Sequence, residues 1–182
     1  MDHADHVELI AGGVGTAQVA GPLWLELGAG EGAFTLALAD VLGTTGSIVA
    51  TDRDARALDV LTSRVRAAFP ATGLVTEVVD FGGLLPGGPF DGVLAANALH
   101  FVRDRRPILA AVRAVLVPSG SLVVVEYDAD TGNAWVPYPF SFETWRREAL
   151  AAGYEEPRLL HRVRSRFLGA IYGAVTRPSG RP

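Results

Sequence analysis

Short apolar runs alternate with longer amphipathic segments along most of the chain. Each apolar run is bounded by Gly, Pro, Asp or Asn, which is typical of buried strands. The amphipathic segments carry apolar residues at helical spacing, and in one of them Ile108, Leu109 and Val112 share a face. Five strands are therefore predicted, at Leu23–Leu27, Ser47–Thr51, Leu74–Val79, Phe90–Ala95 and Ser121–Tyr127.

Helices are predicted between these strands, at Gly32–Leu42, Asp54–Phe69 and Asp104–Leu116. Pro70 is expected to stop the second helix, and Pro118–Gly120 to turn the chain before the fifth strand. Repeated β-α-β units imply a parallel sheet with right-handed crossovers and helices on both faces. The strands are apolar almost throughout, as strands covered on both faces are. The pattern therefore predicts an α/β fold.

The residues after the fifth strand are organised differently. Asp128–Pro139 is predicted to be a loop rich in aromatic and turn residues, and Phe142–Ala152 a helix closed by Gly153. Arg158–Val163 and Phe167–Val175 are two further strands with a short connection. Two strands joined so tightly should form a hairpin, which places one antiparallel strand in the sheet.

Length and composition predict a single packed domain over residues 1–182. The chain is 49% hydrophobic and 20% charged, with a formal net charge of -4 and scattered basic residues, so no nucleic-acid partner is expected. Without cysteine, disulfides and thiolate chemistry are excluded. All 16 basic residues are arginine, which excludes Schiff-base lysine chemistry. The sequence has no signal peptide or membrane-length apolar run, so we expect a cytoplasmic protein without membrane contact.

A glycine cluster, in the sequence LELGAGEG, follows the first predicted strand. Gly28, Gly30 and Gly32 would turn the chain into a helix and let a ligand approach the backbone, to which the helix start offers free N–H groups. Asp52 follows at roughly the 20-residue spacing of an acid that binds ribose hydroxyls. Asp54 is better placed as the N-cap of the next helix. These residues alone are compatible with a simple turn and with the binding sites of several nucleotide-binding families.

Further motifs in order make the chain resemble the class I S-adenosylmethionine-dependent methyltransferases. Glu26–Gly32 is similar to the first motif of that family, an acidic residue followed by Gly-x-Gly-x-Gly, which hosts the methionine part of the cofactor. Asp52 matches the acidic residue that binds the ribose. The likeness extends from about Leu23 to Gly120, with a looser match through the terminal hairpin.

Two later strand ends complete the resemblance. Asp80 and Phe81 match the pair around the adenine, and Asn97 matches a position at the mouth of the methyl-transfer pocket. The resemblance implies S-adenosylmethionine as cofactor and S-adenosylhomocysteine as product. The cofactor-binding residues that it implies are Glu26, Gly28, Ala29, Gly30, Asp52, Arg53, Asp80, Phe81, Asn97 and Ala98.

The resemblance also implies an architecture. We expect a three-layer Rossmann-like sandwich whose seven-stranded, mostly parallel sheet has the order 3-2-1-4-5-7-6 with strand 7 antiparallel, in agreement with the predicted hairpin. Residues 23–127 would form the cofactor-binding core, and residues 128–182 the aromatic loop, helix and terminal β-hairpin. Members usually carry covering helices before the first motif, whereas only residues 1–22 precede it here. A short lid is therefore expected, and a homodimer would complete it.

Candidate residues for chemistry follow the ends of the fourth and fifth strands. Methyl transfer mainly needs proximity and orientation, and a general base is required only if the acceptor must lose a proton early. His100 is the catalytic candidate for that base, with a structural role as the alternative. His100, Tyr127, Trp135 and Tyr138 are expected to line a substrate pocket, although the aromatic residues would serve equally as core.

The aspartates that follow the fifth strand, Asp128 and Asp130, either orient an acceptor or sit in a solvated turn. No metal is expected, because Ala95 and Ala96 offer no carboxylate partner for them.

The sequence therefore predicts a methyltransferase that acts on a small-molecule acceptor. A non-catalytic S-adenosylmethionine-binding module remains an alternative, because the N-terminal segment is short. A nicotinamide-dependent oxidoreductase is a further alternative, since Gly28, Gly30 and Ala33 also fit the dinucleotide pattern. That last interpretation would need a substrate domain for which the chain has little room.

Overall fold

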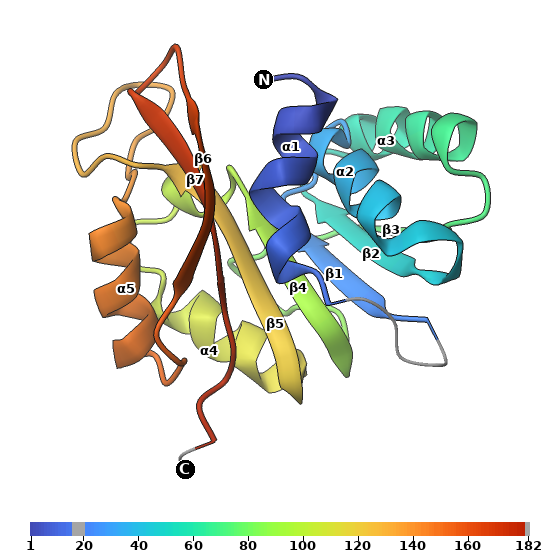
Figure 1. Cartoon of the computed structure of the whole chain (residues 1–182). Coiled ribbons are helices and arrows are strands. Elements are labelled where there is room, and N and C mark those ends of the chain that lie inside the picture. The colour runs from blue at the N-terminus through green and yellow to red at the C-terminus, as the bar shows by residue number, and fades with distance from the viewer. Residues whose placement is uncertain (16–20, 181–182) are drawn as a thin grey trace.

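The computed structural model describes residues 1–15 and 21–180, and its centre is one seven-stranded sheet with helices on both faces (Figure 1). The strand order is β3-β2-β1-β4-β5-β7-β6, and β7 runs antiparallel to both β5 and β6. The predicted α/β class, strand order and antiparallel strand are therefore confirmed. The strands are β1 Leu23–Leu27, β2 Ser47–Asp52, β3 Gly73–Val78, β4 Phe90–Ala96, β5 Leu116–Tyr127, β6 Arg158–Arg164 and β7 Ala170–Thr176.

Helices cover the sheet in two layers, each with its own apolar core. One core joins the sheet to the first three α-helices, and the other joins it to the last two. The α-helices are α1 His3–Ile10, α2 Ala33–Leu42, α3 Ala55–Ala68, α4 Arg106–Val115 and α5 Phe142–Ala151. Short 3-10 turns are η1 Ala11–Gly13, η2 Gly43–Thr45 and η3 Leu99–Phe101.

The start of β5 differs from the sequence prediction. The strand begins at Leu116, so Pro118–Gly120 lies within it and is not a separate turn. Leu116 pairs with Phe90, and the register of β4 against β5 then shifts before regular pairing resumes. Because the shift leaves extra residues unpaired on β5, a proline without an N–H is tolerated there. Pairing with β4 thus overrides the local turn signal.

The terminal hairpin is also wider than predicted. Its turn occupies residues 165–169, closed by a hydrogen bond from the Ser165 amide to the Gly169 carbonyl at 2.8 Å. Gly169 has a φ of 67°, which favours glycine. Phe167 was expected in the strand but lies in this turn and is exposed. The geometry of this turn therefore places the start of β7 at Ala170.

The N-terminal helix packs on the same face as α2. Asp2 caps α1 through a reciprocal capping box with Asp5, and Leu9 and Ile10 are fully buried in the core. Near its end the helix backbone rests on β7 at Gly173, where a Cβ atom would run into the Leu9 carbonyl oxygen. Part of the expected lid segment, residues 16–20, lies outside the described residues, so the lid stays a prediction.

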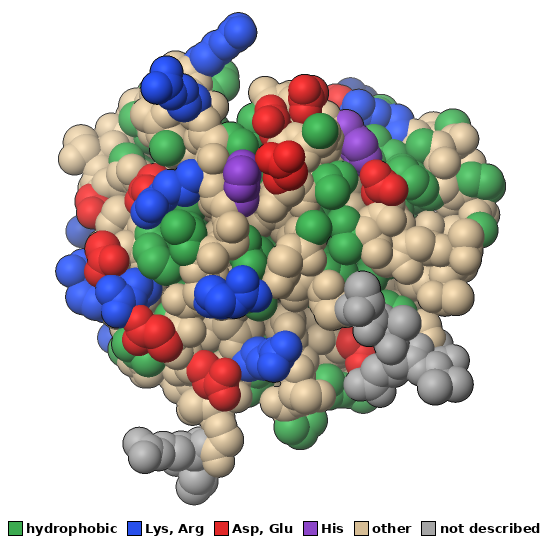
Figure 2. Space-filling view, in the orientation of Figure 1, with side chains coloured by type: hydrophobic (Ala, Val, Ile, Leu, Met, Phe, Trp, Pro, Cys, Tyr) green, Lys and Arg blue, Asp and Glu red, His purple; other side chains and the backbone are tan. Residues whose placement is uncertain are grey.

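On the face seen in Figure 2, acidic and basic side chains are interspersed, so neither sign dominates it. Among the residues that the structure describes, no helix is long and apolar enough to cross a membrane.

Candidate cofactor and acceptor site

The glycine loop after β1 is held close to two other strand ends. Gly28 has a φ of 68°, and a Cβ atom there would lie 2.8 Å from the Cβ of Ala98 and 3.2 Å from Cε1 of Phe81. Only glycine fits this position without displacing a neighbour. Three of the sequence-predicted cofactor residues, which follow the ends of β1, β4 and β3, therefore meet at one point.

Asp52 ties the same loop to the end of β2. Its Oδ2 accepts a hydrogen bond from the Gly30 amide at 2.8 Å, and its Oδ1 accepts one from the Asp54 amide at 2.9 Å. The Ala29 amide also donates to the Thr51 carbonyl at 2.9 Å. A carboxylate has about four acceptor positions, so both Asp52 oxygens retain capacity for a ligand hydroxyl. Asp54 caps α3 as predicted.

Glu26 is the most perturbed acidic residue near the loop. It lies on β1, is 1% exposed, and burial raises its pKa to about 8. The nearby Thr35 hydroxyl opposes this rise and the negative charge of Asp52 adds to it, although Thr35 makes no hydrogen bond of good geometry with Glu26. Glu26 is therefore poised to ionise when a cation arrives beside it.

Three buried acceptor atoms near the loop have no hydrogen-bond partner among the described residues: Glu26 Oε2, Thr35 Oγ1 and Asn97 Oδ1. Asn97 also has a φ of 50°, the only positive value outside glycine in the described chain. Buried polar atoms rarely lack partners, and strained residues gather at functional sites. These acceptors suit an ammonium group, and the open glycine backbone suits a flat or extended ligand. The residues present thus fit S-adenosylmethionine.

The remaining cofactor candidates are more open. Asp80 is exposed and begins a turn, with its Oδ1 accepting from the Gly82 amide at 3.0 Å. Phe81 is half-buried over Gly28, and Arg53 is exposed beside Asp52. They form an open rim next to the buried acceptors, and their cofactor contacts stay predictions.

His100 forms a buried pair with a residue that the sequence reasoning missed, Glu126. His100 Nδ1 lies 2.8 Å from Glu126 Oε2, while Glu126 Oε1 accepts from the amides of Leu99 and His100 at 2.9 and 3.1 Å. The His100 side chain is 4% exposed and that of Glu126 is 0% exposed. Nε2 of His100 makes no hydrogen bond with a described residue. The arrangement fixes the ring and leaves Nε2 available.

A signal for Glu126 was present in the sequence. It is a carboxylate inside the apolar run SLVVVEY, and a buried charge requires a partner. The partner follows from topology, because β4 and β5 are neighbouring parallel strands whose carboxyl ends meet.

The structure separates the predicted pocket aromatics. Tyr127 contacts the His100 ring edge-on, with ring centroids 5.6 Å apart, and the Tyr138 amide donates to the His100 carbonyl at 2.9 Å. Trp135 is 79% exposed, whereas Phe140 is fully buried in the core. The loop after β5 thus places some aromatic side chains in the core and others at the surface. The pocket roles of Tyr127, Trp135 and Tyr138 stay predictions.

Asp128 and Asp130 both stabilise the chain reversal before α5. Asp128 accepts from the Phe142 amide at 2.9 Å and pairs with Arg162 Nε at 2.9 Å, while Asp130 accepts from the Ser141 amide at 3.0 Å. These bonds favour the structural interpretation over a role in orienting an acceptor.

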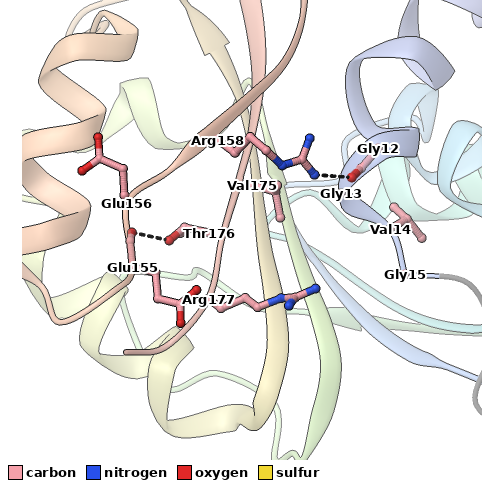
Figure 3. A pocket seen from close by; sticks show the side chains of 10 residues that line it. All are labelled: Gly12, Gly13, Val14, Gly15, Glu155, Glu156, Arg158, Val175, Thr176 and Arg177. Carbon is pink, nitrogen blue, oxygen red and sulfur yellow. Dashed lines mark hydrogen bonds between the residues drawn. The ribbon is translucent and has the colours of Figure 1, made fainter. Parts of the chain in front are cut away.

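A pocket of about 250 Å³ lies at the opposite edge of the sheet (Figure 3). Its residues come from η1 and from the segments around the start of β6 and the end of β7, and none of them belongs to the predicted site. Thr176 in its wall pairs with Leu122 in the middle of β5, whereas the catalytic candidate His100 follows the carboxyl end of β4. Ligands of open α/β sheets bind at the carboxyl ends of the parallel strands, so this pocket does not coincide with the predicted cofactor site.

A family model described as a methyltransferase domain matches residues 25–122, from β1 into β5. The match covers more than half of the chain and includes the glycine loop, Asp52, Asp80 and Asn97. The chain therefore belongs to this family, the class I S-adenosylmethionine-dependent methyltransferases with a Rossmann-like fold.

Two curated relatives are longer proteins. The chain is 30% identical over 102 residues to Highly reducing polyketide synthase 40 of Fusarium mangiferae, covering 56% of this chain and 4% of that protein. It is 27% identical over 123 residues to the ubiquinone/menaquinone biosynthesis C-methyltransferase UbiE of Saccharophagus degradans, covering 67% of this chain and 49% of that one. The chain thus spans half or less of the length of these relatives.

Solved structures share the fold. The YcgJ protein of Bacillus subtilis has a TM-score of 0.75 at 13% identity, covering 98% of this chain and all of that one. The CurJ carbon methyltransferase has a TM-score of 0.72 at 22% identity, covering 90% of this chain and 50% of that one.

Proposed function

We propose that the chain transfers a methyl group from S-adenosylmethionine to a carbon atom of a small-molecule acceptor. The acceptor would carry an acidic C–H bond, such as one between two carbonyl groups. The pairing of His100 Nδ1 with Glu126 Oε2 at 2.8 Å carries this proposal. Oxygen and nitrogen acceptors remain within the family's chemistry, but the buried pair favours an acceptor that must lose a proton.

The geometry of the pair suits a general base. Glu126 accepts the Nδ1 proton of His100, which leaves Nε2 with a free lone pair directed away from Glu126. Two backbone amides donate to Glu126 Oε1 and fix the carboxylate in place. A carbon acid is a poor nucleophile until it is deprotonated, so a fixed base contributes where an amine acceptor would need none.

The chain's residues would act in a short sequence. The glycine loop and Asp52 hold the cofactor, which supplies an electrophilic methyl group bonded to a cationic sulfur. His100 Nε2 would take the acidic proton of the acceptor, and the electron pair of that C–H bond would form the new carbon–carbon bond. The bond between sulfur and the methyl group would break in the same step, and the sulfur would keep its electron pair as a neutral thioether. Glu126 stabilises the imidazolium, which then returns its proton to water. The pair thus acts by orientation and charge stabilisation.

The relatives support the carbon acceptor. UbiE is named as a C-methyltransferase, CurJ as a carbon methyltransferase, and several other matched proteins are polyketide synthases. Family membership also favours methyl transfer over nicotinamide chemistry. A homodimer and the absence of a nucleic-acid partner stay predictions, which sedimentation and a nucleic-acid binding assay would test.

Calorimetry and a methylation assay test the proposal. We expect S-adenosylhomocysteine to bind in the micromolar range and NAD to bind far more weakly. Incubation with S-adenosylmethionine and 1,3-dicarbonyl thioesters should give a product whose new methyl group lies on carbon by NMR. His100→Ala should keep the affinity for S-adenosylhomocysteine and lower the rate about 10²- to 10⁴-fold.

His161→Ala is the matched control, because His161 is half-exposed and paired with Glu8 on the α1 face. It should leave the rate unchanged. Full activity of His100→Ala would overturn the assignment of the base. Normal binding with no methylation across a broad acceptor panel would instead favour the non-catalytic binding module.

A further inference from the structure

Tyr172 on β7 lies directly opposite Glu126 on the neighbouring strand β5. The two residues are partners in the antiparallel β5–β7 ladder, so their side chains project from the same face. Both are 0% exposed. This places a phenol beside the carboxylate that holds His100.

The hydroxyl of Tyr172 has no hydrogen-bond partner among the described residues. Its ring packs edge-on against Phe140 and Phe142, with centroids 6.5 and 5.7 Å away. An apolar cage of this kind would accept phenylalanine, and an unpaired buried hydroxyl destabilises a protein. We therefore expect the Tyr172 hydroxyl to donate a hydrogen bond in some state of the protein.

Three carboxylates act on Tyr172 electrostatically, and Glu126 has the greatest effect of the three. Asp128 is paired with Arg162, and Glu148 with Arg105, so an arginine already balances each of these charges. Among the described residues, Glu126 has no arginine partner, and its Oε2 accepts only from His100. Burial, with a further contribution from Glu126, raises the pKa of Tyr172 well above its ordinary value, so the hydroxyl keeps its proton.

We propose that Tyr172 is a positioning residue whose hydroxyl donates to Glu126 Oε2 when an acceptor occupies the site. The inference rests on the proposed function of His100 and Glu126. The proton of the acceptor goes to His100 Nε2, and Tyr172 retains its own proton throughout. Its role is to share the negative charge of Glu126 and to keep the carboxylate aligned while the imidazole is charged.

Tyr172→Phe tests the inference, with three readouts. Without the phenol, Glu126 would hold a protonated His100 more tightly, so the acidic limb of the kcat profile should move to higher pH by roughly half a unit. We expect kcat to fall roughly tenfold with little change in KM. The imidazole ¹⁵N NMR signals of His100, assigned with His100→Ala, should differ between Tyr172→Phe and the parent protein when an acceptor is bound and agree when none is bound.

Tyr154→Phe is the matched control. Tyr154 is another buried tyrosine, but its hydroxyl donates to the Leu109 carbonyl at 2.7 Å, within the α4–α5 layer. Its loss should lower the melting temperature and leave the pH profile unchanged. Tyr172→Phe with an unchanged pH profile and an unchanged or raised melting temperature would show that the hydroxyl is only an unpaired group, and would overturn the inference.

The two proposals fail in different ways. If His100→Ala lowers the rate while Tyr172→Phe moves neither the rate nor the pH profile, only the role of Tyr172 is refuted. If His100→Ala leaves the rate intact, the proposed base is refuted and Tyr172 has no dyad to position.

Discussion

Asp52 Oδ2 accepts a hydrogen bond from the amide of Gly30 at 2.8 Å, so the acidic end of β2 holds the loop that follows β1. The resemblance to methyltransferases assigns this carboxylate to the ribose, and the structure adds a second role in shaping the loop. A ligand hydroxyl would therefore bind to a carboxylate that is already oriented by the loop.

Asp52→Ala should weaken the binding of S-adenosylhomocysteine by about 1–3 kcal/mol, because it removes the ribose acceptor and releases the Gly30 amide. Asp52→Asn keeps one oxygen acceptor and should lose less. Calorimetry gives both dissociation constants, with Asp59→Ala on the exposed side of α3 as the control. An unchanged constant in Asp52→Ala would remove Asp52 from the site.

Gly28→Ala should abolish cofactor binding, because its Cβ would lie 2.8 Å from the Cβ of Ala98 under a φ of 68°. Gly30→Ala is the matched comparison: its φ is 53°, but nothing lies within 4 Å of the added Cβ. Both variants pay about 1–2 kcal/mol of backbone strain, while only the first meets a neighbour. Equal binding losses in the two variants, measured by calorimetry beside their melting temperatures, would contradict the steric explanation.

Glu26 should make the ligand-free protein less stable as the pH rises. Its pKa is raised to about 8 from an ordinary 4.5, so the folded state holds this proton more tightly than the unfolded chain does. The contribution of Glu26 to the free energy of unfolding is complete below pH 4.5. It is lost as the pH approaches 8, which lowers the free energy of unfolding by up to about 4 kcal/mol.

Urea unfolding at pH 5 and pH 8 measures this loss. Glu26→Gln cannot titrate, so its unfolding free energy should vary less over the same interval. Parallel pH dependence of the two proteins would show that Glu26 is not the titrating group.

Arg105→Met should destabilise the fold by about 2–3 kcal/mol. Arg105 is 8% exposed, pairs with both carboxylate oxygens of Glu148 at 2.7 and 2.8 Å, and donates to the Val102 and Tyr138 carbonyls. The expected cost is below that of a fully buried pair because the Glu148 side chain is 33% exposed.

Arg106→Met is the control in the same turn, since Arg106 pairs with Asp104 on the surface and its loss should not change the melting temperature measurably. Arg105→Met combined with Glu148→Leu should recover part of the stability. No recovery would mean that the backbone carbonyls, and not the carboxylate, are the partners that matter.

Much of the fold could be predicted from the sequence because most strands of the parallel core contain a short apolar run that a turn residue or an acidic residue follows. Leu23–Leu27 is identical in prediction and structure, and Asp54 caps the third α-helix as expected. The start of β5 was missed, since a proline in a bulge looks locally like a turn. The partner strand that makes the bulge lies elsewhere in the sequence.

The site residues likewise divide into those that a local sequence pattern predicts and those that depend on tertiary structure. The glycine loop, Asp52 and Asn97 are readable because they stand at fixed places in a local pattern. The pairing of His100 with Glu126 spans 26 residues and depends on which strands are neighbours. The exposure of Trp135 and the burial of Phe140 depend on how the loop returns to α5, which composition does not specify.

The contact between α1 and Gly173 joins the first helix to the last strand. α1 can pack against α2 as soon as both helices have been synthesised, whereas its contacts with β6 and β7 form only after those two strands have been synthesised. Closure of this face is thus a late, long-range event, which slows folding relative to local contacts. Until then, the part of the α1 surface that faces β6 and β7 stays uncovered.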